Sequence, residues 1–245
     1  MNLRVEVPRA LAALAAYAWP GPCACCGADL PGRAVAGVCP ACWVALPLRI
    51  GPGCPVCDLP GATLATCPDC RTAGGSAPLE TIVTALLYTG AAVTLHRRMK
   101  FGGASDLVPP LARRMASAWR LRGPFEPDLV VPVPPDPLRW TARRRAGRLL
   151  ARGVTRQLGV PLVRALAKTR PTRSQTGRAA EQRRRALDGA FRARREAVEG
   201  RAVLVVDDVV TTGATLREAA RALAAVGAAP IAGLALARTP TGSTT

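Results

Sequence analysis

The residues best placed to do chemistry are Asp207 and Asp208, two adjacent carboxylates within residues 203–215. Four apolar residues precede them, which predicts a buried strand that ends close to the two acids. Carboxylates near a sheet core need a hydrogen-bond donor or a cation, because an unpaired buried charge is costly. The pattern therefore predicts a ligand that offers hydroxyl groups to the acids.

The segment after the acids is a hydroxyl-rich turn that leads into a helix. The first backbone N–H groups of a helix have no partner within it, so those of residues 211–215 predict a binding site for a phosphate. A ribose 5-phosphate meets both demands, because its 2- and 3-hydroxyls can donate to the acids while its phosphate lies on the helix start. The alternative is an ordinary strand-turn-helix connection in which Thr211 or Thr212 merely caps the helix.

Residues 203–215 resemble the phosphoribosyl diphosphate (PRPP) loop of type I phosphoribosyltransferases at every position of its pattern. That pattern is an apolar strand, two acids, two apolar residues, two hydroxyl residues, Gly, a small residue and Thr. The resemblance implies that Asp207 and Asp208 are the catalytic acids that hold the ribose. It also implies that the 5-phosphate is bound by Val209, Val210, Thr211, Thr212, Gly213, Ala214 and Thr215.

A second segment of interest is the proline-rich sequence of residues 130–135. Prolines lack an N–H donor and stiffen the chain, so they end the preceding strand and leave backbone groups exposed to a cleft. The position resembles the pyrophosphate loop of the same enzymes, formed here by Pro132, Val133, Pro134 and Pro135. Three arginines at residues 143–145 follow and could neutralise a leaving diphosphate.

The front of the chain contains nine cysteines, and eight of them form Cys-x-x-Cys pairs: Cys23/Cys26, Cys39/Cys42, Cys54/Cys57 and Cys67/Cys70. Such pairs present two thiolates to one tetrahedral ion, and neighbouring pairs close the shorter loops. We therefore expect two structural zinc sites, one from the first two pairs and one from the last two, with crossed grouping as an alternative.

Two other interpretations of the cysteines are redox catalysis and disulfides. A redox enzyme uses one such pair within a βαβ unit, which so short a Gly- and Pro-rich segment cannot build. Disulfides need an oxidising compartment, and the odd Cys25 would then be a reactive thiol. Both arguments favour zinc in a cytoplasmic protein.

The net charge of +18 is concentrated in one region. Residues 139–200 contain 18 Lys or Arg and 4 acidic residues, a net charge of +14. Such a segment attracts a diphosphate and equally attracts nucleic acid, which makes single-stranded DNA or the DNA-uptake machinery a candidate partner. A solvated helix face is the alternative explanation.

The chain divides into an expected N-terminal helix (1–20), a double zinc ribbon (21–71) and an α/β domain (79–245), joined by a Gly-rich linker. A secretory signal is the alternative for residues 1–20. No later segment is long and apolar enough to span a membrane. We expect strands at residues 82–88, 128–133, 161–165, 202–206 and 230–237. We expect helices at residues 91–99, 107–121, 139–158, 179–187 and 214–226.

Strands that alternate with helices predict an α/β fold, with a mostly parallel sheet and a ligand site at the carboxyl ends of its strands. Over nearly its whole length the chain resembles ComF-family (competence protein F-like) phosphoribosyltransferases, in which these motifs occur in the same order: residues 95–102, 131–134, 173–177, 183–191 and 203–215. That family is linked to DNA uptake in transformation. The resemblance implies PRPP and Mg²⁺ as ligands, an unidentified acceptor, and a substrate pocket that includes Lys100, Gln175, Thr176 and Gly177.

The chain departs from this family after the proline-rich segment, where Arg-Arg-Arg-Ala-Gly at residues 143–147 replaces the usual Arg-Gly-Phe-Asn-Gln. Ala186 also stands where the family often has Asn. The lost amide groups bear on turnover more than on PRPP binding. The alternative function is therefore a nucleic-acid-associated adaptor with a degenerate PRPP-binding fold and zinc ribbons. His96, the single histidine, we expect to be an ordinary core or surface residue.

Overall fold

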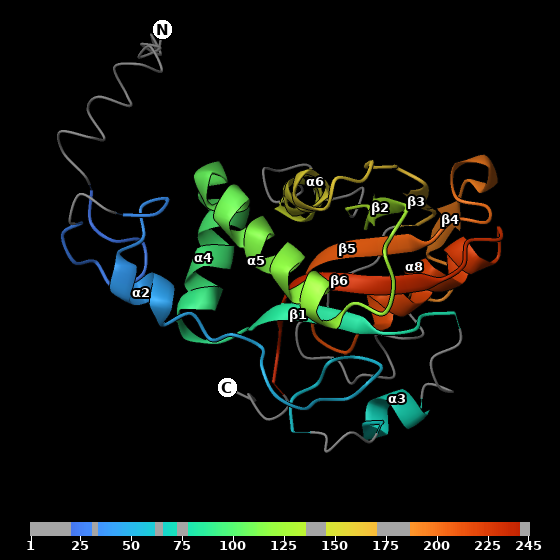
Figure 1. Cartoon of the computed structure of the whole chain (residues 1–245), viewed down its shortest axis with the longest axis horizontal. Helices are drawn as coiled ribbons and strands as arrows, with labels where there is room; N and C mark the ends of the chain where they lie inside the picture. The colour runs from blue at the N-terminus through green and yellow to red at the C-terminus, as the bar shows by residue number, and fades with distance from the viewer. Residues whose placement is uncertain are drawn as a thin grey trace, which may run out of the picture. The chain divides into compact units, whose positions relative to one another are not determined.

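The computed structural model describes residues 21–30, 34–61, 66–72, 78–135, 146–170 and 187–240. The chain separates into two compact units, residues 1–46 and residues 47–245. Figure 1 shows the chain with its helices and strands labelled. The helix expected at residues 1–20 lies outside the described residues.

The first unit contains the short helix α2 (Pro40–Val44). Cys39 is its N-cap, and the Sγ atom of Cys39 accepts a hydrogen bond from the N–H of Cys42 at 3.4 Å. A tight turn closed by hydrogen bonds between Val35 and Val38 precedes the helix. Val38 and Leu46 are buried together with Cys23 and Cys39, so the described interior of this small unit is built from cysteines and two aliphatic side chains.

The second unit contains a parallel sheet with the strand order β1-β6-β5-β2. The strands are β1 (Ile82–Leu87), β2 (Leu129–Pro132), β5 (Val203–Val210) and β6 (Ile231–Arg238). All neighbouring strands of this sheet run parallel, which confirms the predicted fold class. Apart from the acid pair in β5 and Arg238 at the end of β6, the central strands are apolar, because helices or loops cover both faces of a parallel sheet.

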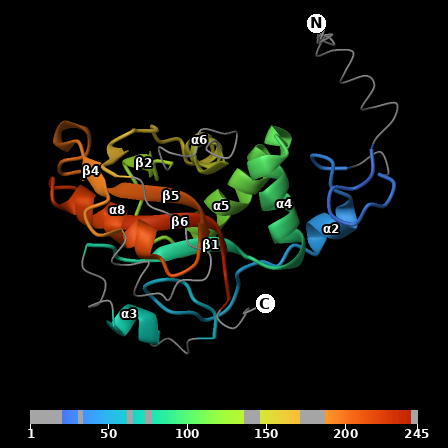
Figure 2. The same cartoon turned by 180° about the vertical axis from the view of Figure 1, so that it is seen from behind.

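Helices cover the two faces of this sheet. The elements are α4 (Gly90–Phe101), η1 (Ser105–Leu107), α5 (Val108–Arg122), α6 (Ala146–Leu158), η3 (Arg195–Ala197) and α8 (Ala214–Ala224). Helix α5 crosses the side of the sheet that faces the viewer in Figure 1, and it packs against α6. Helix α8 lies on the opposite side, which Figure 2 shows in front.

The last two Cys-x-x-Cys pairs, Cys54/Cys57 and Cys67/Cys70, belong to the same compact unit as the sheet. The division into a double zinc ribbon (21–71) and an α/β domain (79–245) remains a prediction. These four cysteines share one hydrophobic cluster with Ile82 of β1, Val205 of β5 and Leu216 of α8. Helix α3 (Pro68–Thr72) contributes Cys70 to that cluster. The second cysteine hairpin is therefore part of the core on the α8 side of the sheet.

A buried ion-pair network fixes this hairpin to the sheet. Asp58 follows the turn of the hairpin, and its carboxylate accepts hydrogen bonds from the backbone N–H and the hydroxyl of Thr84 at 2.9 and 2.6 Å. The guanidinium groups of Arg49 and Arg122 lie 3.1 and 2.9 Å from the same carboxylate. Because Arg122 ends α5 and Thr84 lies in β1, the network joins the hairpin to both elements.

The connection between β2 and β5 differs from the sequence-based expectation. The predicted strand at residues 161–165 is wrong, since this segment forms only a single bridge between Leu162 and Val130. The strand begins later, as β3 (Leu166–Lys168), and pairs antiparallel with β4 (Phe191–Ala193). Strand β4 was not predicted, because the segment is short and lies among arginines. The predicted helix at residues 179–187 lies almost entirely outside the described residues.

The other predicted elements match the structure to within a few residues, apart from residues 139–145 of the basic helix, which lie outside the described part. None of the described helices is both long enough and apolar enough to cross a bilayer.

Candidate functional site

Asp207 and Asp208 lie within β5, near its carboxyl end. The strand continues past the expected residue 206 because it keeps pairing with β6, where Asp207 faces Ala235. On the other side, pairing with β2 stops at Pro132 opposite Val206. The proline-rich exit of β2 therefore leaves the acids without a strand neighbour on that side. This is the carboxyl edge of the sheet, where ligands bind in open α/β folds.

Asp208 is held by two basic side chains from α4. Its Oδ2 atom lies 2.7 Å from Nζ of Lys100 and 3.1 Å from Nε2 of His96. The other ring nitrogen of His96, Nδ1, lies 3.1 Å from the hydroxyl of Tyr88. If Nε2 carries the proton and donates to Asp208, Nδ1 accepts from Tyr88, so one tautomer satisfies the whole chain of contacts.

The two acids differ in their affinity for protons. Burial alone would raise the pKa of Asp208, but the hydrogen bond from His96 and the charge of Lys100 hold that pKa well below its usual range. Burial and the negative charge of Asp208 raise the pKa of Asp207 to about 7, although the N–H of Asp208 donates to its Oδ1 at 2.8 Å. The pair therefore offers one ionised carboxylate and one that exchanges a proton near neutral pH.

The turn after β5 leads into the start of α8, and helix starts are places where proteins bind anions. Gly213 is the N-cap of α8 with φ of 77°, and a Cβ atom there would lie 3.0 Å from Cδ1 of Ile82. This conformation and this close approach both favour glycine. Among the described residues, no hydrogen bond uses the N–H groups of Thr211, Thr212 or Gly213. Three backbone donors at the start of a helix are thus available to a ligand.

The remaining predicted site residues are distributed as follows. Pro132 ends β2, and the N–H of Val133 donates to the carbonyl of Val206 at 2.9 Å, so the proline-rich segment leaves the sheet beside the acids. Lys100 is brought to Asp208. The predicted pocket residues Gln175, Thr176 and Gly177 lie outside the described residues.

His96 is a site residue that the sequence reasoning missed. It was expected to be an ordinary residue, whereas the structure places its ring against Asp208 and buries it almost completely. One sequence signal could have found it. His96 and Lys100 are four residues apart and so share one face of a helix.

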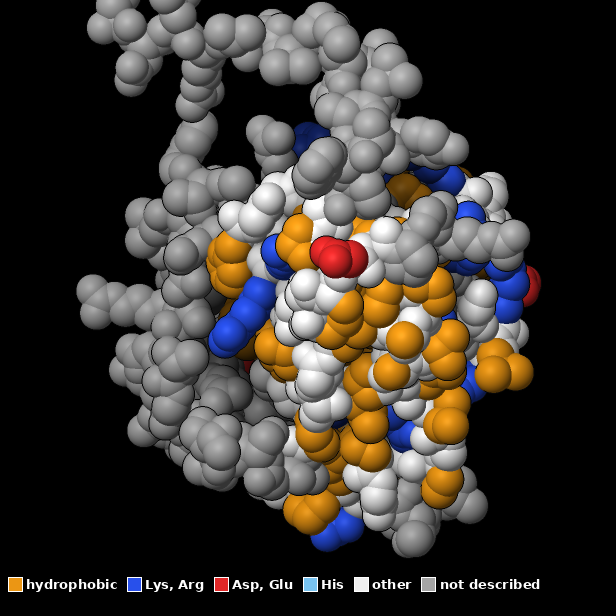
Figure 3. Space-filling model, turned by 90° about the vertical axis from the view of Figure 1, so that its left-hand side faces the viewer, with side chains coloured by type: hydrophobic (Ala, Val, Ile, Leu, Met, Phe, Trp, Pro, Cys, Tyr) orange, Lys and Arg blue, Asp and Glu red, His pale blue; other side chains and the backbone are white. Residues whose placement is uncertain are grey.

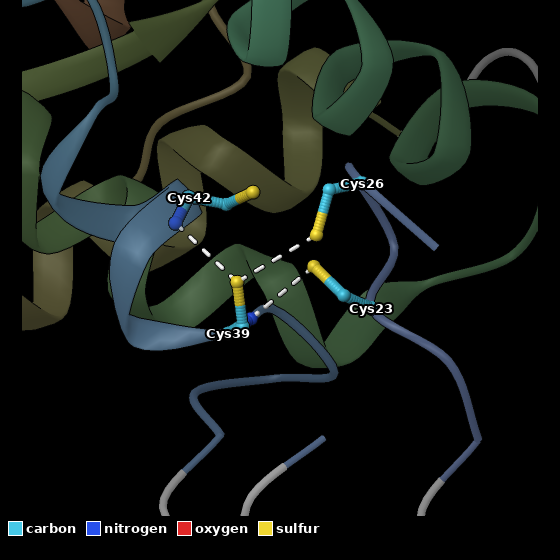
Figure 4. Close-up of side chains that lie close together, drawn as sticks. All are labelled: Cys23, Cys26, Cys39 and Cys42. Atoms are coloured by element: carbon cyan, nitrogen blue, oxygen red, sulfur yellow. Dashed lines mark hydrogen bonds between the residues drawn. The ribbon is translucent and has the colours of Figure 1, made fainter. Parts of the chain in front are cut away.

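The cysteines form two separate clusters, as the grouping of neighbouring pairs predicted. In the first cluster the side chains of Cys23, Cys26, Cys39 and Cys42 converge from α2 and from the facing loop (Figure 4), and their sulfur atoms all lie within 4.8 Å of one another. The Sγ atoms of Cys26 and Cys39 are 3.8 Å apart. Tetrahedral zinc with Zn–S bonds of about 2.3 Å requires a separation of about 3.8 Å.

The second cluster consists of Cys54, Cys57, Cys67 and Cys70, all of them buried. The Sγ atoms of Cys57 and Cys67 are 3.6 Å apart, which again fits tetrahedral zinc. Burial would raise the pKa of Cys54, but backbone N–H donors, led by that of Cys67, outweigh it and lower the pKa to about 7. A four-thiolate site keeps no open coordination position, so its role is structural.

The family of the chain follows from comparison with known proteins. Residues 112–243, which include both acids and the turn after β5, match the phosphoribosyl transferase domain family. The chain belongs to this family. The matched residues run from within α5 to just beyond β6 and so include β2, β5 and β6, whereas β1, α4 and the cysteine clusters precede them.

Curated relatives are named for DNA utilization and competence. The chain is 34% identical to the DNA utilization protein YhgH of Escherichia coli K12 over 192 residues, which are 76% of this chain and 84% of that protein. It is 27% identical to the competence protein ComFC of Bacillus subtilis over 191 residues, 76% of this chain and 77% of that protein. The resemblance to ComF-like proteins is thereby confirmed.

Two solved structures match part of the chain. Glutamine PRPP amidotransferase from B. subtilis matches 53% of this chain and 26% of its own, with 24% identity and a TM-score of 0.37. Purine phosphoribosyltransferase from Pyrococcus horikoshii matches 56% of this chain and 75% of its own, with 20% identity and a TM-score of 0.33.

Proposed function

We propose that the protein binds PRPP together with Mg²⁺ and transfers its phosphoribosyl group to an acceptor. The observation that supports this most directly is an acid pair near the end of β5, followed at once by a turn in which three N–H groups have no partner among the described residues. The acids suit the ribose hydroxyls, and the N–H groups suit the 5-phosphate. A cytoplasmic location is part of the proposal, because PRPP is made and used there.

The ribose end of the ligand meets Asp207 and Asp208. Asp208 is ionised and fixed by Lys100 and His96, so it accepts a hydrogen bond from a ribose hydroxyl without having to reorient. Asp207 carries a carboxyl whose pKa of about 7 lets it donate to or accept from the neighbouring hydroxyl. A fixed negative charge at this place also stabilises positive charge that develops on the sugar ring.

The diphosphate end would lie beside the proline-rich exit of β2, at residues 132–135. Mg²⁺ prefers oxygen ligands, and the diphosphate and the nearby carboxylates supply them. When bound, it neutralises the charge of the leaving group.

The proposed reaction is a displacement at the anomeric carbon of PRPP. The bond from C1 to the diphosphate oxygen breaks, the diphosphate leaves with the electron pair, and the acceptor forms the new bond to C1 and releases a proton. Charge builds up on the ring as the old bond lengthens, so catalysis depends on positioning and charge stabilisation and needs no protein nucleophile.

A second candidate is an adaptor that binds nucleic acid, with the PRPP fold as a scaffold. The names of the relatives and the charge of +14 on residues 139–200 favour it. On the face drawn in Figure 3, acidic side chains of the described residues are few, and Lys and Arg are spread among hydrophobic groups. Such a face does not repel a polyanion.

Two binding assays separate these candidates. Thermal unfolding is followed with PRPP and Mg²⁺, and binding of single-stranded DNA is followed over a salt series. The proposed enzyme is stabilised by PRPP, and the D207N/D208N double variant loses that stabilisation. A steep salt dependence of DNA binding without any PRPP-induced shift supports the adaptor instead.

Turnover needs a separate assay, because binding does not prove transfer. Release of diphosphate from PRPP is measured with nucleobases and nucleosides as acceptors. Accelerated release with one acceptor class supports transfer to that class. Binding without release by any acceptor restricts the proposal to PRPP recognition.

A further inference from the structure

Two arginines connect the second cysteine cluster to the turn after β5 (residues 211–213), which is the proposed phosphate-binding turn. Arg217 of α8 donates from NH1 to Sγ of Cys70 at 3.5 Å and from NH2 to the carbonyl of Thr212. Arg238 at the end of β6 donates from NH2 to Sγ of Cys57 at 3.5 Å and from NH1 to the carbonyl of Thr211. Each guanidinium thus binds a sulfur of the second cluster with one nitrogen and a carbonyl of the turn with another.

Peptide geometry makes these contacts relevant to phosphate binding. In a trans peptide the C=O bond and the N–H bond of the next residue point in opposite directions. Arg238 draws the carbonyl of Thr211 toward the cluster, so the N–H of Thr212 points away from it. Arg217 draws the carbonyl of Thr212 toward the cluster in the same way, so the N–H of Gly213 also points away from it. These two N–H groups are among the unpartnered donors of the turn.

The charges of the arginines match those of a metal-loaded cluster. Four thiolates around one Zn²⁺ carry a net charge of −2, and the four cysteines here are all buried. Arg238 is also buried, with only 1% of its surface exposed, and no carboxylate of the described residues pairs with it. A buried cation needs a counter-charge, and the cluster supplies it for both Arg217 and Arg238.

We propose that Arg217 and Arg238 are positioning residues, which hold the phosphate-binding turn in place by binding both to the turn and to the metal-loaded second cluster. Occupancy of this cluster by metal therefore controls the affinity of the turn for the 5-phosphate. The inference rests on the proposed function, because it concerns the same phosphate site. It assigns the second cluster a role in ligand binding, and it assigns none to the first cluster.

The test uses lysine variants of the full-length protein. Lysine keeps the positive charge but is a single point donor, so it cannot hold a sulfur and a carbonyl together as the guanidinium fork does. Arg217→Lys and Arg238→Lys are compared with Arg221→Lys. Arg221 lies one turn further along α8 and pairs with Glu218 and Asp188 instead. Arg217 is only partly buried, so its variant keeps the test valid should Arg238→Lys fail to fold.

Affinity for PRPP is measured by calorimetry. We expect it to fall about tenfold to a hundredfold in Arg217→Lys and Arg238→Lys, the scale of one lost charge-assisted hydrogen bond, and to stay unchanged in Arg221→Lys. If the wild type binds PRPP and the lysine variants bind it equally well, this inference is wrong and the proposed function stands. If the wild type does not bind PRPP, both are wrong.

A spectroscopic readout separates positioning from general stability. In protein loaded with Co²⁺, the thiolate-to-cobalt absorption band reports hydrogen bonding to the sulfur atoms. We expect ribose 5-phosphate to change the band in the wild type and in Arg221→Lys but not in Arg217→Lys. Cobalt in the first cluster contributes the same absorption to all three proteins, with and without the ligand. An identical spectral response in Arg217→Lys and wild type would overturn the inference.

Discussion

Lys100 Nζ lies 2.7 Å from Oδ2 of Asp208, so a cation of α4 forms an ion pair with the second acid of β5. The charge of Lys100 helps to keep Asp208 ionised and offsets part of the negative charge that PRPP must approach. We predict that Lys100→Met weakens PRPP binding by about tenfold or more, since one close ion pair is lost. Calorimetric titration measures this.

Lys100→Arg is the matched control for that variant, because it keeps the charge. Retention of most of the affinity in Lys100→Arg is expected. Full affinity in Lys100→Met would show that the ion pair has no part in ligand binding.

The raised pKa of Asp207 makes stability depend on pH. Its folded-state pKa of about 7 lies above the ordinary value of 3.8. Between about pH 4 and 7 the folded state therefore binds more protons than the unfolded state, and stability falls as the pH rises through this window. Asp207→Asn stays uncharged, so we predict that it melts at a higher temperature than the wild type at pH 8, with the difference shrinking toward pH 4.

Thermal melts of the ligand-free protein at a series of pH values test this dependence. Asp208 acts in the opposite direction, but its lowered pKa confines that effect to pH values below the window. A gap between Asp207→Asn and the wild type that does not vary with pH would contradict the assignment.

The two cysteine clusters should differ in their importance for the phosphoribosyl transferase domain. Cys67→Ser removes a ligand from the cluster that packs with α8 and the sheet, so we predict that the melting temperature falls by about 10 °C or more. Cys39→Ser disrupts the cluster in the separate unit of residues 1–46 and should leave the main transition nearly unchanged.

Zinc content and calorimetric melts of the two serine variants provide the measurement. Each variant should lose one of two zinc equivalents. Equal loss of stability in both would show that the first unit supports the fold as much as the second cluster does.

The close packing of α5 and α6 gives a prediction on stability. A Cβ atom at Gly153 would lie 2.4 Å from Cβ of Ala112, so Gly153→Ala overpacks this contact at a cost of about 1–3 kcal/mol. The gain in helix propensity, about 1 kcal/mol, is smaller. At Gly147 on the same helix the nearest atom is 3.9 Å away, so Gly147→Ala should be neutral or stabilising. Chemical denaturation measures both, and the reverse order would refute the close contact.

The sequence predicted those parts of the site in which the chemistry is local. The acid pair, the turn after it and the four Cys-x-x-Cys pairs are contiguous motifs, so residue type and spacing were sufficient. The strands of the parallel sheet were predictable for the same reason, because each is an apolar run bounded by Gly, Pro or charged residues.

The features that sequence reasoning missed depend on long-range contacts. His96 contacts Asp208 although the two are 112 residues apart in the sequence, and Arg238 contacts Cys57 across 181 residues. A single arginine among many, or a single histidine, carries no local signal of its partner. Strand β4 forms only because β3 lies beside it.

The most direct test of the account is the position of PRPP in a crystal of the protein soaked with PRPP and Mg²⁺. We predict that the ribose hydroxyls lie within hydrogen-bond distance of Asp207 and Asp208, and that the 5-phosphate accepts hydrogen bonds from the N–H groups of Thr212 and Gly213. Density for the ligand at another place, or an acid pair that keeps only its contacts with Lys100 and His96 at saturating ligand, would contradict the account.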